Sequence, residues 1–358
     1  MYKNIVIIPA LNPPCEILKK YIASLIEHGC ERILIVDDGS SADYKEMFSF
    51  LETYKEVRIF RHVVNLGKGR ALKNAFNYAF TEWGMEDCAG VITVDSDGQH
   101  TVEDVVALQN ELNRQTAPAL LLGMRDFDDL NVPFKSRYGN KITSGIFKLL
   151  YGIKLKDTQT GLRGIPKEYL LQYMDLDGER FEYEMNMLIF GAIHKHSMKQ
   201  IKIQTVYFNN NSETHFRPFV DSMKIYKLIF SGFFKYLFAS LSSAIIDLLM
   251  FHMMTGFLAS MKTEIAIIIS TVIARIISSL YNFLLNRNVV FKSAGNTWKQ
   301  MIRYYVLCFV QLCCSAGFVV LLNCLIGWDK TFEKLIVDSV LFVISYRIQR
   351  SWVFKEKK

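Results

Sequence analysis

Residues 91–100 of this chain, VITVDSDGQH (Val91–His100), carry more information about its architecture than any other stretch. The β-branched start predicts a buried strand that runs directly into Asp95-Ser96-Asp97. Alternate residues of an extended chain point the same way, so both carboxylates can converge on one point beyond the strand. Two such hard oxygen ligands suit Mg²⁺ or Mn²⁺, ions that usually bridge to nucleotide phosphates. An Asp pair that merely caps the next helix is the alternative.

The chain of 358 residues has two parts that differ in composition. Residues 1–215 mix charged and apolar side chains as a water-soluble domain does, whereas long apolar runs begin at Phe233. An apolar strand pattern at Ile5–Pro9 follows the first residues without a signal-peptide pattern, so we expect the first part to stay in the cytosol. The seven cysteines show neither metal-ligand spacing nor a disulfide framework.

Strand and helix patterns alternate along the first part. Such alternation predicts an α/β domain with a mainly parallel, Rossmann-like sheet, in which ligands bind beyond the carboxyl ends of the strands. We expect strands at Ile5–Ile8, Arg32–Val36, Val57–Arg61, Gly90–Val94 and Ala119–Gly123, separated by helices at Glu16–His28, Tyr44–Thr53, Lys68–Thr81 and Thr101–Arg114.

Four polar clusters fall at the expected carboxyl ends of these strands. Asp37 or Asp38 can accept hydrogen bonds from a nucleobase or a ribose. Lys68, Gly69 and Arg70 lie at a helix N-terminus, which favours an anion such as a diphosphate, although a solvated helix start is the alternative. Neither the Walker spacing nor G-x-G-x-x-G is present, so a dinucleotide-dependent dehydrogenase is not expected. The clusters are Asn12, Asp37-Asp38, Asn65–Arg70 and Asp95–His100.

Seven ordered blocks resemble the family-2 glycosyltransferases that make polyprenyl-phosphate hexoses, typified by dolichyl-phosphate mannose synthase. The resemblance implies a GT-A fold, a metal-bound nucleotide sugar and a lipid-phosphate acceptor. The blocks are Ile8–Asn12, Val36–Ser40, Asn65–Gly69, Asp95–His100, Gly123–Arg125, Arg137–Asn140 and Asp157–Arg163, and Phe181–Glu184 follows them.

The resemblance also implies roles for single residues. It assigns the nucleotide to Pro9, Ala10, Asp37 and Lys68, the metal and diphosphate to Asp95, Asp97 and Gln99, and the lipid phosphate to Arg125 and Arg137. To the set that binds the donor we add Asn12, Asp38, Gly69 and Gln159.

The chain departs from the family pattern just after the Pro-Ala pair. Leu11-Asn12-Pro13 stands where the family often has Tyr and Asn-Glu, and Met124 replaces a Ser. The nucleotide base is therefore not inherited from the family. We favour a UDP-hexose donor, with GDP-mannose as the alternative.

The chemistry of such a transfer can be argued from the residues alone. A lipid phosphate is already an anion, so it needs positioning and charge cancellation on the departing diphosphate rather than a strong base. The guanidinium forks of Arg125 and Arg137 can position the lipid phosphate. Asp95 and Asp97 with a metal can cancel charge on the departing diphosphate. Direct attack would invert the anomeric carbon. Asp157 is the best remaining carboxylate for the sugar, or a cap residue. Glu182 and Glu184 are interpreted as structural.

Two segments combine basic and apolar faces, which suits an anionic membrane surface. They are Pro133–Tyr151 and Arg217–Gly232, and packing against the domain is the alternative for each. We expect a catalytic domain over residues 1–215, an interface helix over 216–232, and a membrane domain over 233–358.

The apolar part predicts four membrane spans, of which the first three reach the ~20 residues that crossing requires. Basic residues are concentrated in the loops on one side, so the positive-inside rule places the catalytic domain and both termini in the cytosol and the chain in the cell membrane. The spans are Phe233–Leu258, Ile265–Leu285, Tyr304–Ile326 and Phe332–Tyr346.

The membrane part contains an internal repeat. Asn286–Lys292 returns as Gln349–Lys355, and Lys235-Tyr236 corresponds to Arg303-Tyr304. Paired helices in two copies are a known way to build membrane bundles. This half resembles the GtrA family of four-helix membrane proteins, which is associated with moving or presenting polyprenyl-linked sugars. Charges in hydrocarbon are usually paired, so we expect Asp247 to contact Arg275.

The leading hypothesis is an enzyme that moves a hexose from a nucleotide sugar to undecaprenyl, dolichyl or a related polyprenyl phosphate at the cytosolic leaflet. A flippase or membrane anchor for polyprenyl-linked sugars, with a secondary catalytic half, is the alternative. A processive polysaccharide synthase is not favoured, because the soluble half lacks a Gln-x-x-Arg-Trp block. We expect the membrane, the lipid and the nucleotide sugar as partners and no nucleic acid, and a homo-oligomer stays open.

Overall fold

The computed structural model describes residues 2–125, 134–204 and 218–355, and it divides into two compact units at Ile229 and Phe230. The two units are described separately. The expected boundaries at 215 and 232 lie on either side of this division. The segment expected as an interface helix is the first part of a continuous helix, α8 (Pro218–Phe257), apart from residues 216 and 217, which lie outside the described residues.

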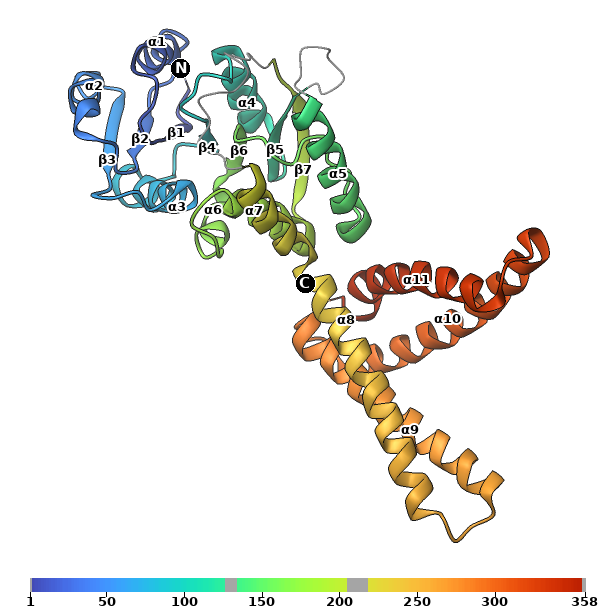
Figure 1. Cartoon of the computed structure of the whole chain (residues 1–358). Coiled ribbons are helices and arrows are strands. Elements are labelled where there is room, and N and C mark those ends of the chain that lie inside the picture. Colours follow the sequence, from blue (N-terminus) through green and yellow to red (C-terminus); the bar gives the residue numbers. More distant parts are fainter. Residues whose placement is uncertain (1, 126–133, 205–217, 356–358) are drawn as a thin grey trace. The chain divides into compact units, whose positions relative to one another are not determined.

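The first unit is built around a seven-stranded sheet with the order β3-β2-β1-β4-β6-β5-β7 (Figure 1). All described strand pairs are parallel except those that β6 makes with β4 and β5. The predicted α/β domain with a mainly parallel sheet is therefore confirmed. The strands are β1 (Ile5–Ala10), β2 (Ile33–Asp37), β3 (Val57–Arg61), β4 (Gly90–Thr93), β5 (Ala119–Met124), β6 (Arg163–Pro166) and β7 (Ser197–Lys202).

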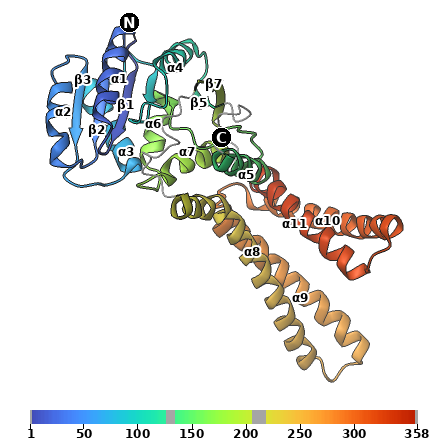
Figure 2. The same ribbon diagram turned by 45° about the horizontal axis from the view of Figure 1, so that its top comes forward.

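Helices cover both faces of this sheet (Figures 1 and 2). The apolar sides of α1, α2 and α4 pack with β1 and β2 into one buried cluster, which includes Ile22, Phe48 and Leu108. Helices α3, α6 and α7 lie on the opposite face. The helices of this unit are α1 (Cys15–Glu27), α2 (Lys45–Leu51), α3 (Lys68–Tyr78), α4 (Val102–Arg114), α5 (Phe134–Tyr151), α6 (Lys167–Met174) and α7 (Glu182–His194).

Strand direction explains why distant polar segments meet at one edge of the sheet. Strands β1, β2, β4 and β5 all end at this edge, because they run the same way. Strand β6 runs against them, and its first residue, Arg163, pairs with Thr93, the last residue of β4. The segment before β6 therefore reaches the same edge as the Asp95–His100 loop.

Strands β6 and β7 have no counterpart among the strands expected from the sequence. Strand β6 has only four residues, and one of them is glycine and one proline, so its pattern is not typical of a strand. It becomes a strand because β4 and β5 flank it on both sides.

The second unit consists of two helical hairpins. The first contains α8 and α9 (Thr263–Leu285), and the second contains α10 (Thr297–Ile326) and α11 (Lys330–Ile348). By length and composition, three helices of the described chain could cross a membrane: Met223–Phe257, Thr263–Val290 and Thr297–Ile326. The fourth expected span lies in α11, whose first turns carry the charged residues Lys330, Glu333 and Lys334. This fourth span stays a prediction.

The repeat found in the sequence corresponds to repeated structure in this unit. Its two copies form short π-helical turns, η4 (Asn286–Val290) and η5 (Gln349–Val353), which touch through a hydrogen bond of 3.2 Å from Asn286 to Gln349. The rings of Phe291 and Phe354, also equivalent in the repeat, stack with centroids 5.1 Å apart. The turns thus join the two hairpins at equivalent positions.

A pair of cross-links repeats in the same way between the hairpins. Tyr304 donates to Asn282 at 2.8 Å, and the equivalent Tyr236 donates to Ser345 at 3.3 Å. Further along the first hairpin, Arg275 lies 3.3 Å from Asp247, so the predicted ion pair is confirmed.

Candidate active site

The side chain of Lys68 lies between two carboxylates at the carboxyl edge of the sheet. Its ammonium is 2.5 Å from Asp95 and 3.0 Å from both oxygens of Glu184. Lys68 begins α3, Asp95 follows β4, and Glu184 is in the first turn of α7. Burial alone would lower the pKa of Lys68, but the charges of Asp95 and Glu184 outweigh burial and raise it above its usual value. Lys68 is therefore a firmly held cation.

Asp95 is surrounded on three sides by groups that fix its carboxylate. Besides Lys68, Nε2 of His100 lies 3.7 Å away. Burial alone would raise the pKa of Asp95, but Lys68 and His100 hold it well below its ordinary value. On the third side the carboxylate packs directly against Gly161, where there is no room for a side chain: a Cβ at this position would collide with the Asp95 oxygens. Asp95 is thus ionised and has little room to move.

Asp97 has the opposite electrostatic environment. Burial and the neighbouring charge of Asp95 both raise its pKa. One Asp97 oxygen accepts the backbone N–H of Gln99 at 3.0 Å. Its negative charge is therefore less well compensated than that of Asp95.

This donor set fits a divalent cation. Asp95 and Asp97 offer hard carboxylate oxygens, Gln99 adds an amide oxygen, and the poorly compensated charge of Asp97 would be relieved by a cation beside it. In the described residues no group of three or more His, Cys, Asp or Glu side chains gathers as a metal cage. Mg²⁺ is typically held by one or two carboxylates together with substrate phosphates, so a complete cage is not needed.

The loops after β1 and β2 form the neighbouring part of the edge. Asn12 adopts a left-handed conformation (φ 46°), and its amide oxygen accepts the N–H of Ser41 at 2.9 Å. Asp37 accepts the N–H of Ser40 at 2.9 Å. Pro9 and Ala10 end β1 beside them, in register with Val36 and Asp37. The structure thus brings these four candidates for donor binding together.

Asp38 is turned toward the loop that leads to Lys68. Its oxygens accept the N–H groups of Leu66 and Gly67 at 2.9 and 2.8 Å, and Nδ1 of His62 lies 2.6 Å away. Asp38 is nearly fully buried. Its carboxylate therefore holds the start of α3 in place.

Close packing explains the two glycines around Lys68. A Cβ at Gly67 would meet the carbonyl of Glu179, and one at Gly69 would lie 2.6 Å from Cβ of Tyr183. Gly69 is therefore a packing position against the α7 region. Arg70, the next residue, pairs with Glu179 through two hydrogen bonds of 2.6 and 2.8 Å.

Arg125 and Asp157 form a two-pronged ion pair beyond β5. Nε and Nη2 of Arg125 donate to the two Asp157 oxygens at 2.6 and 3.1 Å. Asp157 also accepts the N–H of Gln159 at 3.0 Å, and its side chain is fully buried. The Asp157 carboxylate therefore orients Arg125, and Gln159 reaches this site through its backbone. Arg137 lies one turn into α5, half-buried.

The sequence does not single out two residues of this site, Glu184 and Arg163, as functional. The sequence pattern of its helix predicts a structural role for Glu184, whereas in the structure Glu184 shares the Lys68 ammonium with Asp95. The fully buried Arg163 donates to the carbonyls of Thr160 and Glu184, at 3.0 and 2.7 Å, and so ties the segment before β6 to α7. Local sequence could not reveal the contacts of Glu184 with Lys68 and with Arg163, because they join residues 116 and 21 positions apart.

Two family models match this chain. The model described as Glycosyl transferase family 2 matches residues 5–173, and the model described as GtrA/DPMS, transmembrane domain, matches residues 229–354. The two matches fall on the first and second compact units, respectively, apart from Ile229.

The chain is similar in sequence to three proteins, each over about half of its length or slightly more or less. An uncharacterized protein of Methanocaldococcus jannaschii is 29% identical over 212 residues, 56% of this chain and 81% of the relative. A UDP-N-acetylglucosamine–dolichyl-phosphate N-acetylglucosaminyltransferase of Methanococcus voltae is 29% identical over 219 residues, 56% of this chain and 84% of the relative. A dolichyl-phosphate beta-glucosyltransferase of Saccharomyces cerevisiae is 27% identical over 181 residues, 44% of this chain and 52% of the relative.

Proposed function

Because this chain is a family 2 glycosyltransferase joined to a GtrA/DPMS transmembrane domain, we propose that it transfers a hexose from a nucleotide sugar to a polyprenyl phosphate at the cytosolic face of the cell membrane. The observation that carries this proposal is the meeting of Asp95, Lys68 and the Arg125–Asp157 pair at the carboxyl edge of one sheet. Two relatives that are named as dolichyl-phosphate glycosyltransferases support the lipid acceptor.

The acidic pair would hold the donor through a metal. Asp95 and Asp97, with Gln99, would bind Mg²⁺ or Mn²⁺, which cancels charge on the diphosphate as it leaves. Lys68 stands next to Asp95 and adds a fixed positive charge at the start of α3, where the helix dipole also favours an anion. The donor diphosphate would thus meet positive charge from the chain itself.

The arginines would hold the acceptor. A guanidinium fork matches the geometry of a phosphate, and the Asp157 carboxylate keeps Arg125 in one orientation. Arg137 would be the second phosphate ligand. The lipid phosphate oxygen would then attack the anomeric carbon directly and invert it, without a proton to remove.

The loops after β1 and β2 would hold the nucleoside. Pro9, Ala10, Asn12 and Asp37 line this part of the edge, with hydrogen-bond acceptors suited to a base or a ribose. We favour a uridine nucleotide, and the name of the M. voltae relative, which includes UDP-N-acetylglucosamine, supports that choice.

Helix α5 would bring the site to the bilayer. Its exposed stripe contains Tyr138, Ile142 and Leu149, which are each about half exposed, with Lys141 and Lys148 alongside. Apolar side chains flanked by lysines suit the surface of an anionic leaflet. The positive-inside rule supports the cytosolic leaflet as this surface.

The deciding experiment supplies purified full-length protein in bilayers with labelled nucleotide sugars, one at a time, and a short polyprenyl phosphate. We expect one donor to label the extracted lipid, only when the lipid carries its phosphate and Mn²⁺ or Mg²⁺ is present. Asp97→Ala should abolish the labelled lipid. Full turnover by this variant, or in the presence of a chelator, would refute the proposal.

A further inference from the structure

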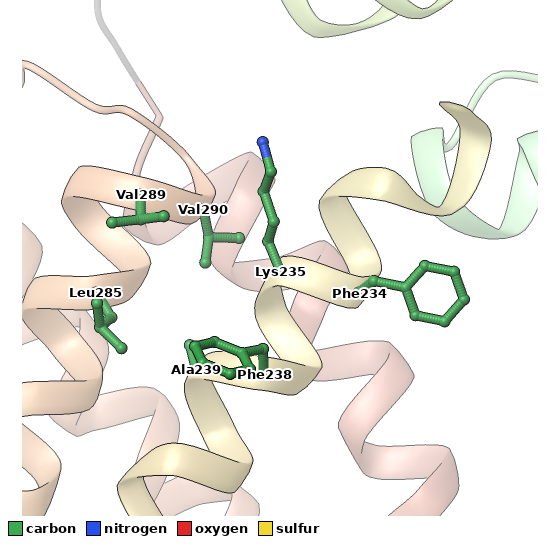
Figure 3. A pocket seen from close by; sticks show the side chains of 7 residues that line it. All are labelled: Phe234, Lys235, Phe238, Ala239, Leu285, Val289 and Val290. Carbon is green, nitrogen blue, oxygen red and sulfur yellow. The ribbon is translucent and has the colours of Figure 1, made fainter. Parts of the chain in front are cut away.

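An apolar groove lies in the second unit between residues 234–239 of α8 and the turn η4. Its volume is about 290 Å³. Figure 3 shows the ammonium of Lys235 raised beside Val290, above the apolar side chains. Lys235 is exposed and makes no hydrogen bond or ion pair with any residue that the structure describes. The lining residues are Phe234, Lys235, Phe238, Ala239, Leu285, Val289 and Val290.

The internal repeat shows what this groove lacks. The residue equivalent to Lys235 is Arg303, and the residue equivalent to Val289 is Trp352. In the second hairpin, Arg303 donates to the carbonyl oxygen of Trp352 at 3.0 Å, and its guanidinium lies 5.8 Å from the centre of the indole ring. There the cation has an internal partner and a large ring beside it.

In the first hairpin, valine stands where the second has tryptophan. Val289 cannot cover the groove as an indole does, and it offers Lys235 no aromatic face. The same fold position therefore has an open apolar surface and a cation without a partner among the described residues. Both are properties of a site for a molecule with a hydrocarbon chain and a negative charge.

We propose that this groove binds one anionic phospholipid of the surrounding bilayer. An acyl chain would lie against Phe238, Leu285 and Val289, and the headgroup phosphate would lie at Lys235. Burial of an alkyl chain against apolar side chains suits the lining, and a lysine at the end of a span attracts anionic headgroups. A single ammonium is a point charge that suits a bilayer headgroup, whereas the proposed acceptor phosphate is assigned to a pair of guanidinium forks.

The test measures lipid binding to the full-length protein and does not depend on its enzymatic activity. Protein purified in detergent is titrated with dimyristoyl phosphatidylglycerol or dimyristoyl phosphatidylcholine, and bound lipid is counted by native mass spectrometry. We expect one phosphatidylglycerol per chain, bound about fivefold more tightly than phosphatidylcholine, as one lysine beside an anionic headgroup predicts.

Three variants locate the binding. Lys235→Gln should lower the affinity for phosphatidylglycerol to that for phosphatidylcholine and leave the latter unchanged. Val289→Trp should weaken both lipids, because it places in the groove the large ring that stands at the equivalent position of the second hairpin, Trp352. Lys299→Gln removes an exposed lysine that does not line the groove and should behave as the wild type.

Three results would overturn the proposal. They are an unchanged lipid preference in Lys235→Gln, an equal loss in Lys299→Gln, and displacement of phosphatidylglycerol by an equimolar short polyprenyl phosphate. If Val289→Trp does not fold, Lys235→Gln still decides, because Lys235 is exposed and its replacement leaves the apolar packing in place.

Discussion

The guanidinium of Arg125 is held by both oxygens of the buried Asp157 carboxylate, with Nε 2.6 Å from Oδ2 and Nη2 3.1 Å from Oδ1. The pair joins the end of β5 to the segment before β6. A carboxylate that receives two guanidinium N–H groups fixes the direction of the arginine as well as its position. Asp157 therefore determines the orientation of the Arg125 guanidinium.

Asp157→Asn should raise the KM for the polyprenyl phosphate and leave the KM for the donor unchanged. An amide cannot accept both N–H groups, and the loss of a charged hydrogen bond corresponds to about 10- to 100-fold in kcat/KM. Initial rates with each substrate varied in turn measure this effect. Asp87→Asn is the control, because Asp87 forms a similar two-pronged pair with Arg32 at the start of β2, on the opposite edge. A rise in the donor KM alone would contradict the assignment.

Gly161→Ala should lower turnover about 100-fold while the protein still folds. The added Cβ would push the Asp95 carboxylate away from its place, and small displacements of catalytic groups have effects of this size. Turnover and the thermal unfolding midpoint should be measured together. Gly145→Ala on α5 provides the control, because a Cβ there meets no other group within 4 Å. Equal activity of the two variants would show that the position of Asp95 is unimportant.

Glu184→Gln should raise the Mn²⁺ concentration needed for half-maximal activity. Lys68 is shared between Glu184 and Asp95, so the loss of the Glu184 charge strengthens its attraction to Asp95 and makes it compete with the metal. The measurement is a metal titration at saturating substrates. Glu182→Gln is a matched control on the same turn, because within the described chain Glu182 accepts only backbone N–H groups, those of Glu179 and Arg180. An unchanged titration curve would exclude this role.

Glu179 should stabilise the first unit at neutral pH and lose this effect in acid. Burial alone would raise its pKa, but hydrogen bonds from Lys73 and Arg70 outweigh burial and lower it. A lowered folded-state pKa gives stability above the unfolded-state pKa of about 4.3, and this stability is lost as pH falls through the folded-state value. Because Glu179 is 44% exposed, we expect only about 1 kcal/mol.

The measurement is the thermal unfolding midpoint of the wild type and of Glu179→Gln between pH 7 and pH 3. The wild type should unfold at the higher temperature near pH 7, and the difference should shrink below about pH 4.5. A difference that grows in acid would contradict the sign of the pKa shift.

The sequence predicted the first strands of the sheet because their signal is local. Val91–Val94 and Ile5–Ala10 are rich in β-branched and apolar residues and lead within two residues to polar ones, and both contribute buried strands that end at the site. The Asp247–Arg275 pair was also predictable, because two charges in apolar helices need a partner. By contrast, the short β6 carries no local strand signal, since its neighbours in the sheet create it.

The sequence by itself determined the alternation of strands and helices, the apolar second half and the residue types available for phosphate chemistry, because periodicity and composition are written along the chain. Only the tertiary structure decided which of these residues meet. In the fold, Lys68 pairs with both Asp95 and Glu184, and the Asp38 carboxylate accepts hydrogen bonds from the loop before α3. The physical reason is that a carboxylate at a crowded sheet edge pairs with the nearest available donor, and that donor comes from a segment whose position is fixed by packing.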